Sequence, residues 1–185
     1  EESPTPSPAE GQVLVTTLAS ALSAGSELLV YRGQLPKAAA TCQSEIPALR
    51  GQLDYPTRFG YSLVGRVEHL GPSVDSSWLG RKVFAFHPHE SHFLASPDEL
   101  MILPEEMEAE RAVFLPNMES AVNFVHDGRP LLGERVLVLG QGIVGLLTVA
   151  LLGRFPLQEL VSVDPVLLRR QASLRLGAHR SLAPE

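Results

Sequence analysis

Three glycines that follow an apolar run are spaced as in a turn that holds phosphate groups. The run 136–139 is apolar and leads into a G-x-G-x-x-G pattern at Gly140, Gly142 and Gly145, after which apolar residues recur at helical spacing. In such a strand–turn–helix unit, the first glycine makes the tight turn, the second lets the backbone approach a pyrophosphate, and the third lets the helix pack closely on the strand. The pattern predicts a dinucleotide site; the alternative is a glycine-rich turn in an α/β protein that binds no nucleotide.

The residues that follow supply the other parts of such a site. Ile143 and Val144 belong to the predicted first helical turn, whose free N–H groups and positive dipole end would face the phosphates. Asp164 ends a second apolar run about 20 residues beyond the glycines, where a carboxylate accepts hydrogen bonds from the ribose hydroxyl groups. Because Asp164 would repel a 2′-phosphate, the sequence favours NAD over NADP. Arg169 and Arg170 are close enough in sequence to leave NADP as an alternative cofactor, or they form the solvated face of the next helix.

A histidine-rich segment is the second candidate for chemistry. His87, His89 and His92 occur close together with Glu90, and imidazole and carboxylate groups are metal ligands. A proline inside the segment makes convergence of all three imidazoles demanding, so we expect a substrate-facing loop with one histidine in a cleft rather than a metal site. The single cysteine, Cys42, excludes an internal disulfide and a multi-cysteine zinc site, and its lack of a histidine neighbour argues against a nucleophile.

Two kinds of secondary structure must position these residues. Before residue 104, short strands separated by glycine, proline and serine turns are typical of a β-barrel-like domain. Strands are expected at 12–17, 61–68, 81–86 and 100–103, with a short helix at 26–32 and an irregular loop at 34–56. After residue 104, helices are expected at 105–113, 117–126, 142–154 and 165–176, with strands at 134–139 and 159–164. The two strands and the helix between them predict a βαβ unit with a parallel sheet.

Composition and charge exclude several classes of protein. The 185 residues are enough for one large domain, or for one domain and part of another, and 44% hydrophobic with 19% charged residues is typical of a globular protein. The net charge of −6 and the absence of a basic cluster argue against nucleic-acid binding. Charge or proline interrupts every apolar run, and residues 1–10 have no secretory-signal pattern, so we expect a cytoplasmic protein without a membrane span.

Four segments carry motifs that occur together in one known superfamily. Residues 24–33, 59–67, 80–83 and 163–178 resemble the motifs C-G-T/S-D…Y-x-G, G-H-E-x-x-G-x-V, G-D-R-V and V-D…R…A…L-G-A of the medium-chain dehydrogenases/reductases, the relatives of zinc alcohol dehydrogenase. The resemblance implies an α/β plus β architecture. It consists of a flexible N-terminus at 1–10, a GroES-like β-barrel catalytic domain at 11–104, connecting helices at 105–130 and the first half of a Rossmann doubly wound parallel sheet at 131–185. The active site would lie between the two domains, and the missing half of the sheet implies a fragment or a second part outside this sequence.

The chain departs from the zinc-binding members of that superfamily at the metal ligands. Ala24 and Tyr61 stand where those members have a cysteine and a histidine, the third ligand would fall near Asn117, and the four-cysteine zinc lobe is missing. A methyl group and a phenol do not replace thiolate and imidazole as zinc ligands. The resemblance therefore predicts no zinc. It extends to a subgroup that lacks these ligands, which includes proteins similar to bacteriochlorophyllide a dehydrogenase.

Without zinc, hydrogen-bond donors or an acid must manage the charge on the substrate oxygen during hydride transfer. Tyr61 is the first candidate, because it stands where a zinc ligand would face the cleft; the alternative is a packed strand tyrosine. Glu27 is expected in a polar network beside it, whereas Ser26 is better explained as a helix cap. Asn117 and Glu119 begin the next helix and either point into the cleft or cap that helix.

Together these residues predict a zinc-independent, NAD(P)-dependent oxidoreductase that acts on a small alcohol, carbonyl or enone. NAD is the expected cofactor, NADP is the other option, and a small-molecule substrate is the expected partner. A non-catalytic nucleotide-binding member of the same fold is the alternative, as is a truncated product that cannot close its nucleotide site. The resemblance also suggests a homodimer formed through the Rossmann domain.

Overall fold

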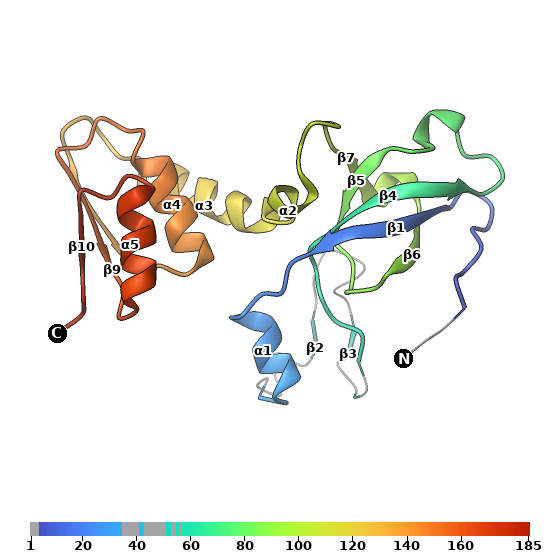
Figure 1. Cartoon of the computed structure of the whole chain (residues 1–185), viewed down its shortest axis with the longest axis horizontal. Coiled ribbons are helices and arrows are strands. Elements are labelled where there is room, and N and C mark those ends of the chain that lie inside the picture. Colours follow the sequence, from blue (N-terminus) through green and yellow to red (C-terminus); the bar gives the residue numbers. More distant parts are fainter. Residues whose placement is uncertain (1–3, 35–40, 43–50, 53–54, 56) are drawn as a thin grey trace. The chain divides into compact units, whose positions relative to one another are not determined.

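The chain folds into two compact units, Glu1–Phe114 and Leu115–Glu185, which we call the first and the second unit (Figure 1). In this computed structural model, residues 4–34, 41–42, 51–52, 55 and 57–185 are described. The first unit contains an antiparallel sheet and the second a parallel sheet, so the chain is a mixed α/β protein. Most of the predicted loop 34–56 lies outside the described residues.

The first unit is built on a five-stranded antiparallel sheet with the order β6-β1-β4-β5-β7. Its strands are β1 (Val13–Ser20), β4 (Leu63–Leu70), β5 (Lys82–Ala85), β6 (His92–Ala95) and β7 (Leu100–Ile102). The short pair β2 (Thr41–Cys42) and β3 (Gly51–Gln52) forms a separate ladder. Helix α1 (Ser26–Tyr31) follows β1, and α2 (Ala109–Ala112) ends the unit. The described part of the unit also has the 3-10 turns η3 (Ser76–Trp78) and η4 (Pro97–Glu99).

Apolar side chains from neighbouring strands form the core of the first unit. Val15 pairs with Val67 of β4 and with Phe93 of β6, and all three side chains are almost completely buried. Gly65 allows β1 and β4 to approach closely, because a Cβ atom there would lie 2.4 Å from Cγ1 of Val15. β6 was not predicted as a strand, because its polar start at His92 hides the alternation of buried and half-buried positions that follows.

The segment after β7 differs from the predicted helix at 105–113, which exists only as α2. The buried Lys82 donates hydrogen bonds through Nζ to the carbonyl oxygens of Glu105 at 2.5 Å and Met107 at 2.8 Å. In an α-helix those oxygens would accept from N–H groups four residues later. Because these two carbonyl oxygens accept from Lys82 instead, the segment does not form a helical first turn, although its acidic and apolar residues have helical spacing.

The second unit is built on a three-stranded parallel sheet with the order β10-β9-β8. Its elements are α3 (Leu115–Gly128), β8 (Arg135–Leu139), α4 (Ile143–Leu152), β9 (Glu159–Val163), α5 (Leu167–Arg175) and β10 (Arg180–Leu182). These bounds agree with the predicted alternation to within about two residues, and β10 is an additional strand. Val125 of α3, Val149 and Leu152 of α4 and Leu160 of β9 form its core.

The sheet of the second unit buries one face more than the other. Val136 and Val138 of β8 pack on the helical core, whereas Leu137 and Leu139 are 57% and 73% exposed. This follows from the period of two in a strand, which sends alternate side chains to opposite faces. Among the described residues, no helix has the length and apolar character needed to cross a membrane.

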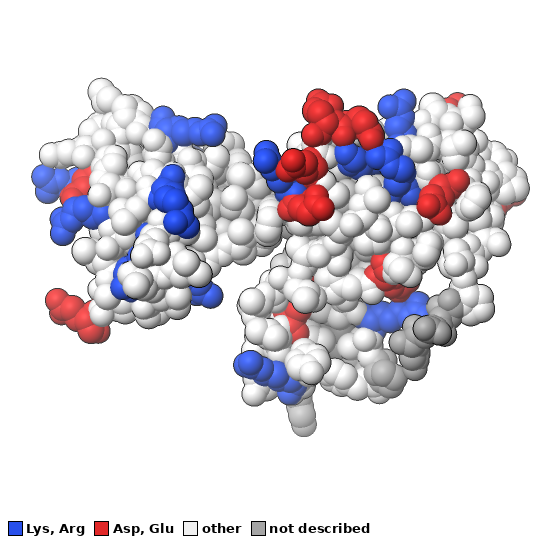
Figure 2. All heavy atoms as spheres, viewed as in Figure 1, with Lys and Arg blue, Asp and Glu red and all other residues white. Residues whose placement is uncertain are grey.

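On the face shown in Figure 2, Lys and Arg side chains are scattered over both units, and several acidic side chains lie close together on the upper part of the first unit.

Candidate functional site

The glycine-rich turn joins β8 to the N-terminus of α4. Gly140 has a φ of +83°, in the left-handed region that favours glycine, and its N–H donates to Val163 O at 2.8 Å. Helix α4 begins at Ile143, with Gly142 as its N-cap, and no side chain caps its first turn. Ile143 is 40% exposed at that end and Val144 is half-buried. The turn therefore presents a helix N-terminus without a capping side chain or an acidic residue in its first turn.

The three glycines meet different constraints. A Cβ atom at Gly145 would lie 1.9 Å from Gly140 O, so this position must lack a side chain for the helix to pack on the turn. At Gly142 the backbone has a φ of −70°, and a Cβ atom would meet no described atom within 4 Å. The conformation of the described chain therefore explains glycine at 140 and 145 but not at 142.

Asp164 lies directly after β9 and ties the turn to the second strand. Its Oδ2 accepts from the N–H of Gln141 at 2.7 Å and its Oδ1 accepts from the N–H of Val166 at 2.8 Å. The residue is only 3% exposed. Arg169 places Nη1 3.8 Å from Oδ2, and Arg170 donates to Asp164 O at 2.8 Å. The sequence did not single out Gln141. It donates to Asp164 through its backbone N–H, and because any residue type has such a group, the side chain at this variable position of the motif gives no signal for the contact.

The pKa of Asp164 is lowered by this environment. Burial opposes ionisation of the carboxyl group, but the hydrogen bonds from Val166 and Gln141 outweigh it, with help from the charges of Arg169 and Arg170. The ionised form is therefore the one that holds the turn.

Asp164→Asn is expected to destabilise the second unit at neutral pH. Because the folded-state pKa is lowered, the carboxylate contributes stability above the pKa of the unfolded chain, and this contribution is lost as pH falls through the folded pKa. The difference in urea midpoint between wild type and Asp164→Asn should therefore shrink from about pH 7 to about pH 3. A constant difference across this range would mean that the carboxylate charge does not stabilise the turn.

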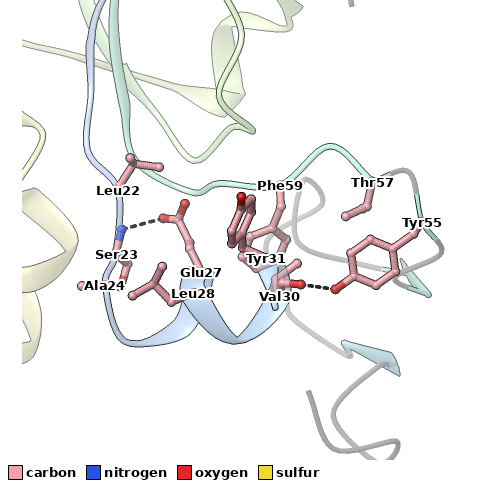
Figure 3. Close-up of a pocket in the computed structure, with 10 residues that line it drawn as sticks. All are labelled: Leu22, Ser23, Ala24, Glu27, Leu28, Val30, Tyr31, Tyr55, Thr57 and Phe59. Atoms are coloured by element: carbon pink, nitrogen blue, oxygen red, sulfur yellow. Dashed lines mark hydrogen bonds between the residues drawn. The ribbon is translucent and has the colours of Figure 1, made fainter. Parts of the chain in front are cut away.

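A pocket of about 790 Å³ in the first unit lies over α1 (Figure 3). Its walls are mostly apolar and aromatic: Leu22, Ser23, Ala24, Glu27, Leu28, Val30, Tyr31, Tyr55, Thr57 and Phe59. The hydroxyl group of Tyr55 donates to Val30 O, which holds that ring against the helix. Ala24 is part of this wall, so a methyl group borders the pocket at that position.

Glu27 is the charged group among the described residues that line this pocket. Its Oε1 accepts from the N–H of Ser23 at 2.9 Å, and its Oε2 lies 2.6 Å from Nε2 of His89. One carboxylate oxygen points toward the N–H of Ser23 (Figure 3), and the residue is 8% exposed. The sequence predicted Glu27 in a polar network and one histidine of the 87–92 segment in a cleft, but gave no signal that His89 would be its partner.

The other predicted residues are distributed over both units. Tyr61 is half-buried just before β4 and is not among the residues that line the pocket. Asn117, half-buried, and Glu119, exposed, lie near the start of α3 in the second unit. Their catalytic roles stay predictions.

The three histidines of the 87–92 segment have separate partners. His87 stacks on Phe93, with ring centroids 4.2 Å apart, and Nδ1 of His92 lies 3.1 Å from Ser91 Oγ. Among the described residues, no three His, Cys, Asp or Glu side chains are grouped closely enough to hold a metal ion.

The fold has close relatives among solved structures, although no family model and no curated protein matches the sequence. An alcohol dehydrogenase from Escherichia coli CFT073 in complex with NADH matches 97% of this chain and 57% of its own, with a TM-score of 0.71 and 21% identity. A zinc-binding dehydrogenase from Clostridium scindens gives a TM-score of 0.74, with 14% identity, 99% coverage of this chain and 57% of its own. A quinone oxidoreductase from Thermus thermophilus gives 0.68 with 21% identity, 99% coverage of this chain and 54% of its own.

The chain has the fold of the medium-chain dehydrogenases/reductases. It spans little more than half the length of the structures that it matches. The match runs over both units, so the predicted order of a β-rich part followed by a βαβ unit with a parallel sheet is confirmed at the level of the fold.

Proposed function

We propose that this chain is part of a zinc-independent, NAD(P)-dependent oxidoreductase of the medium-chain dehydrogenase/reductase superfamily. Residues 11–104 would form its GroES-like domain, residues 105–130 the connecting helices and residues 131–185 the first half of a Rossmann domain. The enzyme would transfer a hydride to or from a small alcohol, carbonyl or enone. A homodimer through the Rossmann domain is part of the same proposal.

The observation that carries the proposal is the unexplained glycine at 142. Gly140 is needed for a left-handed turn and Gly145 for packing, whereas Gly142 has an ordinary φ and open surroundings. A glycine with no structural need, at the uncapped N-terminus of a helix, is accounted for by a pyrophosphate that approaches the backbone there. The fully buried side chain of Gln141, whose Oε1 has no partner among the described residues, adds an acceptor beside this turn.

The residues around the turn fit a nicotinamide dinucleotide, which supplies the hydride acceptor or donor when bound. The N–H groups at the start of α4 would hold the pyrophosphate. Asp164, at the end of β9, would accept from the ribose hydroxyl groups and favours NAD. The Arg169 guanidinium, half-exposed and 3.8 Å from that carboxylate, is the group available for a 2′-phosphate. Parallel titrations with NADH and NADPH distinguish the two cofactors.

The residues at the zinc position support a mechanism without that metal. A methyl group at Ala24 and a phenol at Tyr61 are not zinc ligands. The charge on the substrate oxygen would then be managed by hydrogen bonds and proton transfer. Tyr61, Glu27, Asn117 and Glu119 are the residues proposed for this work.

Gly142→Ala tests the nucleotide site directly. The extra methyl group meets no described atom, so the fold should be retained, but it would stand between the backbone and the pyrophosphate. We expect NADH binding, measured by the fluorescence of the bound cofactor, to weaken about tenfold or more, which corresponds to about 1.4 kcal/mol. Gly128→Ala, at another open glycine, is the matched control and should bind NADH as the wild type does. Equal affinity of all three proteins would remove the main support for the proposal.

A non-catalytic nucleotide-binding protein is the second candidate, favoured by the lack of zinc ligands at Ala24 and Tyr61. A turnover assay distinguishes this candidate from the oxidoreductase. Oxidation of NADH in the presence of benzaldehyde, cyclohexanone or cyclohexenone supports the oxidoreductase. NADH binding without oxidation by any of these probes supports the second candidate.

A further inference from the structure

A line of hydrogen-bonded side chains leads from the pocket of the first unit to its surface. Glu27 lines the pocket, and its Oε2 lies 2.6 Å from Nε2 of His89. Nδ1 of the same ring lies 3.0 Å from Oγ of Ser20. Ser20 is exposed at the end of β1, whereas the side chains of His89 and Glu27 are 23% and 9% exposed. The imidazole therefore connects a buried carboxylate to a hydroxyl group in contact with solvent.

The backbone around the imidazole holds it in this position. The N–H of His89 donates to Phe59 O at 3.2 Å, and a Cβ atom at Gly60 would lie 2.6 Å from Cδ2 of the ring. Gly60 also has a φ of +134°, which side chains rarely allow. Gly60, which follows the pocket residue Phe59, therefore leaves room for the ring of His89.

The described residues that line the pocket offer this carboxylate few competing partners. Most of its wall is apolar or aromatic, and the hydroxyl group of Tyr55 is engaged with Val30 O. Outside the pocket, the neighbouring acid Glu90 is paired with Arg58 at 3.3 Å, and His87 is stacked on Phe93. A proton released inside the pocket would therefore meet Glu27 before any other described charged group.

We propose that Glu27, His89 and Ser20 form a proton path between the pocket and solvent. Glu27 is the catalytic residue that exchanges a proton with the substrate oxygen, and His89 is a positioning residue that passes it on. The inference rests on the proposed oxidoreductase function and assigns the proton-handling role to Glu27 and His89 rather than to Tyr61. Imidazole suits this role because it both accepts and donates a proton near neutral pH.

The steps balance for an alcohol substrate. The O–H bond breaks and its proton passes to the carboxylate of Glu27 and then to Nε2 of His89. These steps start from the His89 tautomer that carries its proton on Nδ1. That proton leaves to Ser20 Oγ, whose own proton goes to water, so one proton enters the path and one leaves it. Exchange of the ring N–H protons with solvent then restores the starting tautomer. A nicotinamide, when bound as in the proposed function, would supply the acceptor for the hydride, which would leave the substrate carbon with both electrons of the C–H bond. Reduction of a carbonyl group runs through the same steps in reverse.

The first test compares His89→Ala with His87→Ala, the neighbouring histidine of the same segment, in the full chain. With NADH and benzaldehyde, we expect His89→Ala to lower kcat about a hundredfold while NADH affinity stays unchanged. Free imidazole, which fits the space left by the ring, should restore much of the loss. His87→Ala should keep kcat near wild type and show no response to imidazole. Wild-type kcat in His89→Ala, or a loss that imidazole does not restore in a variant with wild-type circular dichroism, overturns the proposal.

A second measurement does not depend on turnover, and it separates failure of the path from failure of the oxidoreductase proposal. Nuclear magnetic resonance can follow exchange of the His89 ring N–H protons with solvent in wild type and in Glu27→Gln. If Glu27 only anchors the ring, the weaker hydrogen bond to glutamine should make exchange faster. If Glu27 takes up the proton, glutamine blocks that route and exchange should become slower. Slower exchange supports the path even if no probe is reduced, and faster or unchanged exchange overturns it even if the enzyme is active.

Discussion

Gly145→Ala is expected to unfold much of the second unit. The added Cβ atom would lie 1.9 Å from Gly140 O, which is a backbone atom and cannot move aside as a flexible side chain would. Overpacking typically costs about 1–3 kcal/mol and occasionally more, a large part of the stability of a typical domain. The change should lower the urea midpoint of the second unit, measured by far-ultraviolet circular dichroism, and should abolish NADH binding with it.

The single tryptophan provides an internal control for this experiment. Trp78 packs on the core of the first unit, so its fluorescence reports on that unit alone. Its unfolding curve should be the same in wild type and in Gly145→Ala. Gly128→Ala, where the new methyl group meets no described atom, should leave both curves near wild type. A wild-type circular dichroism curve for Gly145→Ala would contradict the close packing of α4 on the turn.

Phe93→Ala is expected to have a comparable effect on the first unit. Phe93 is 2% exposed, lies opposite Val15 and carries the ring of His87 on its face. Removing a buried phenyl ring costs about 3–5 kcal/mol through lost burial and the cavity that remains. Trp78 fluorescence should report a lower urea midpoint for the first unit.

An exposed phenylalanine of the same unit is the control that distinguishes the effect of burial from the effect of replacing a phenylalanine. Phe114 is 39% exposed, and Phe114→Ala should change stability by less than about 1 kcal/mol. Equal losses for the two variants would contradict the assignment of Phe93 to the core.

The second unit of the chain was largely predictable, because its signals are local. The apolar run before Gly140, the spacing to Gly145 and the position of Asp164 each depend on residues close together in sequence, and their elements lie within about two residues of the predicted bounds. The helix expected at 105–113 was wrong over its first turn, because the carbonyl oxygens needed there are bound by Lys82, more than 20 residues earlier. β6 was missed because its polar start obscures the alternation.

By itself, the sequence determined the order of a β-rich unit before a βαβ unit, the glycine turn, and the absence of thiolate and imidazole at Ala24 and Tyr61. These conclusions follow from residue type and short-range spacing. Only the tertiary structure brought His89 within 2.6 Å of Glu27, left Tyr61 out of the pocket wall and engaged both oxygens of Asp164 with backbone N–H groups. The partners in the first pair are 62 residues apart in the chain. Such a contact depends on how strands and loops pack, and no local pattern of residues encodes it.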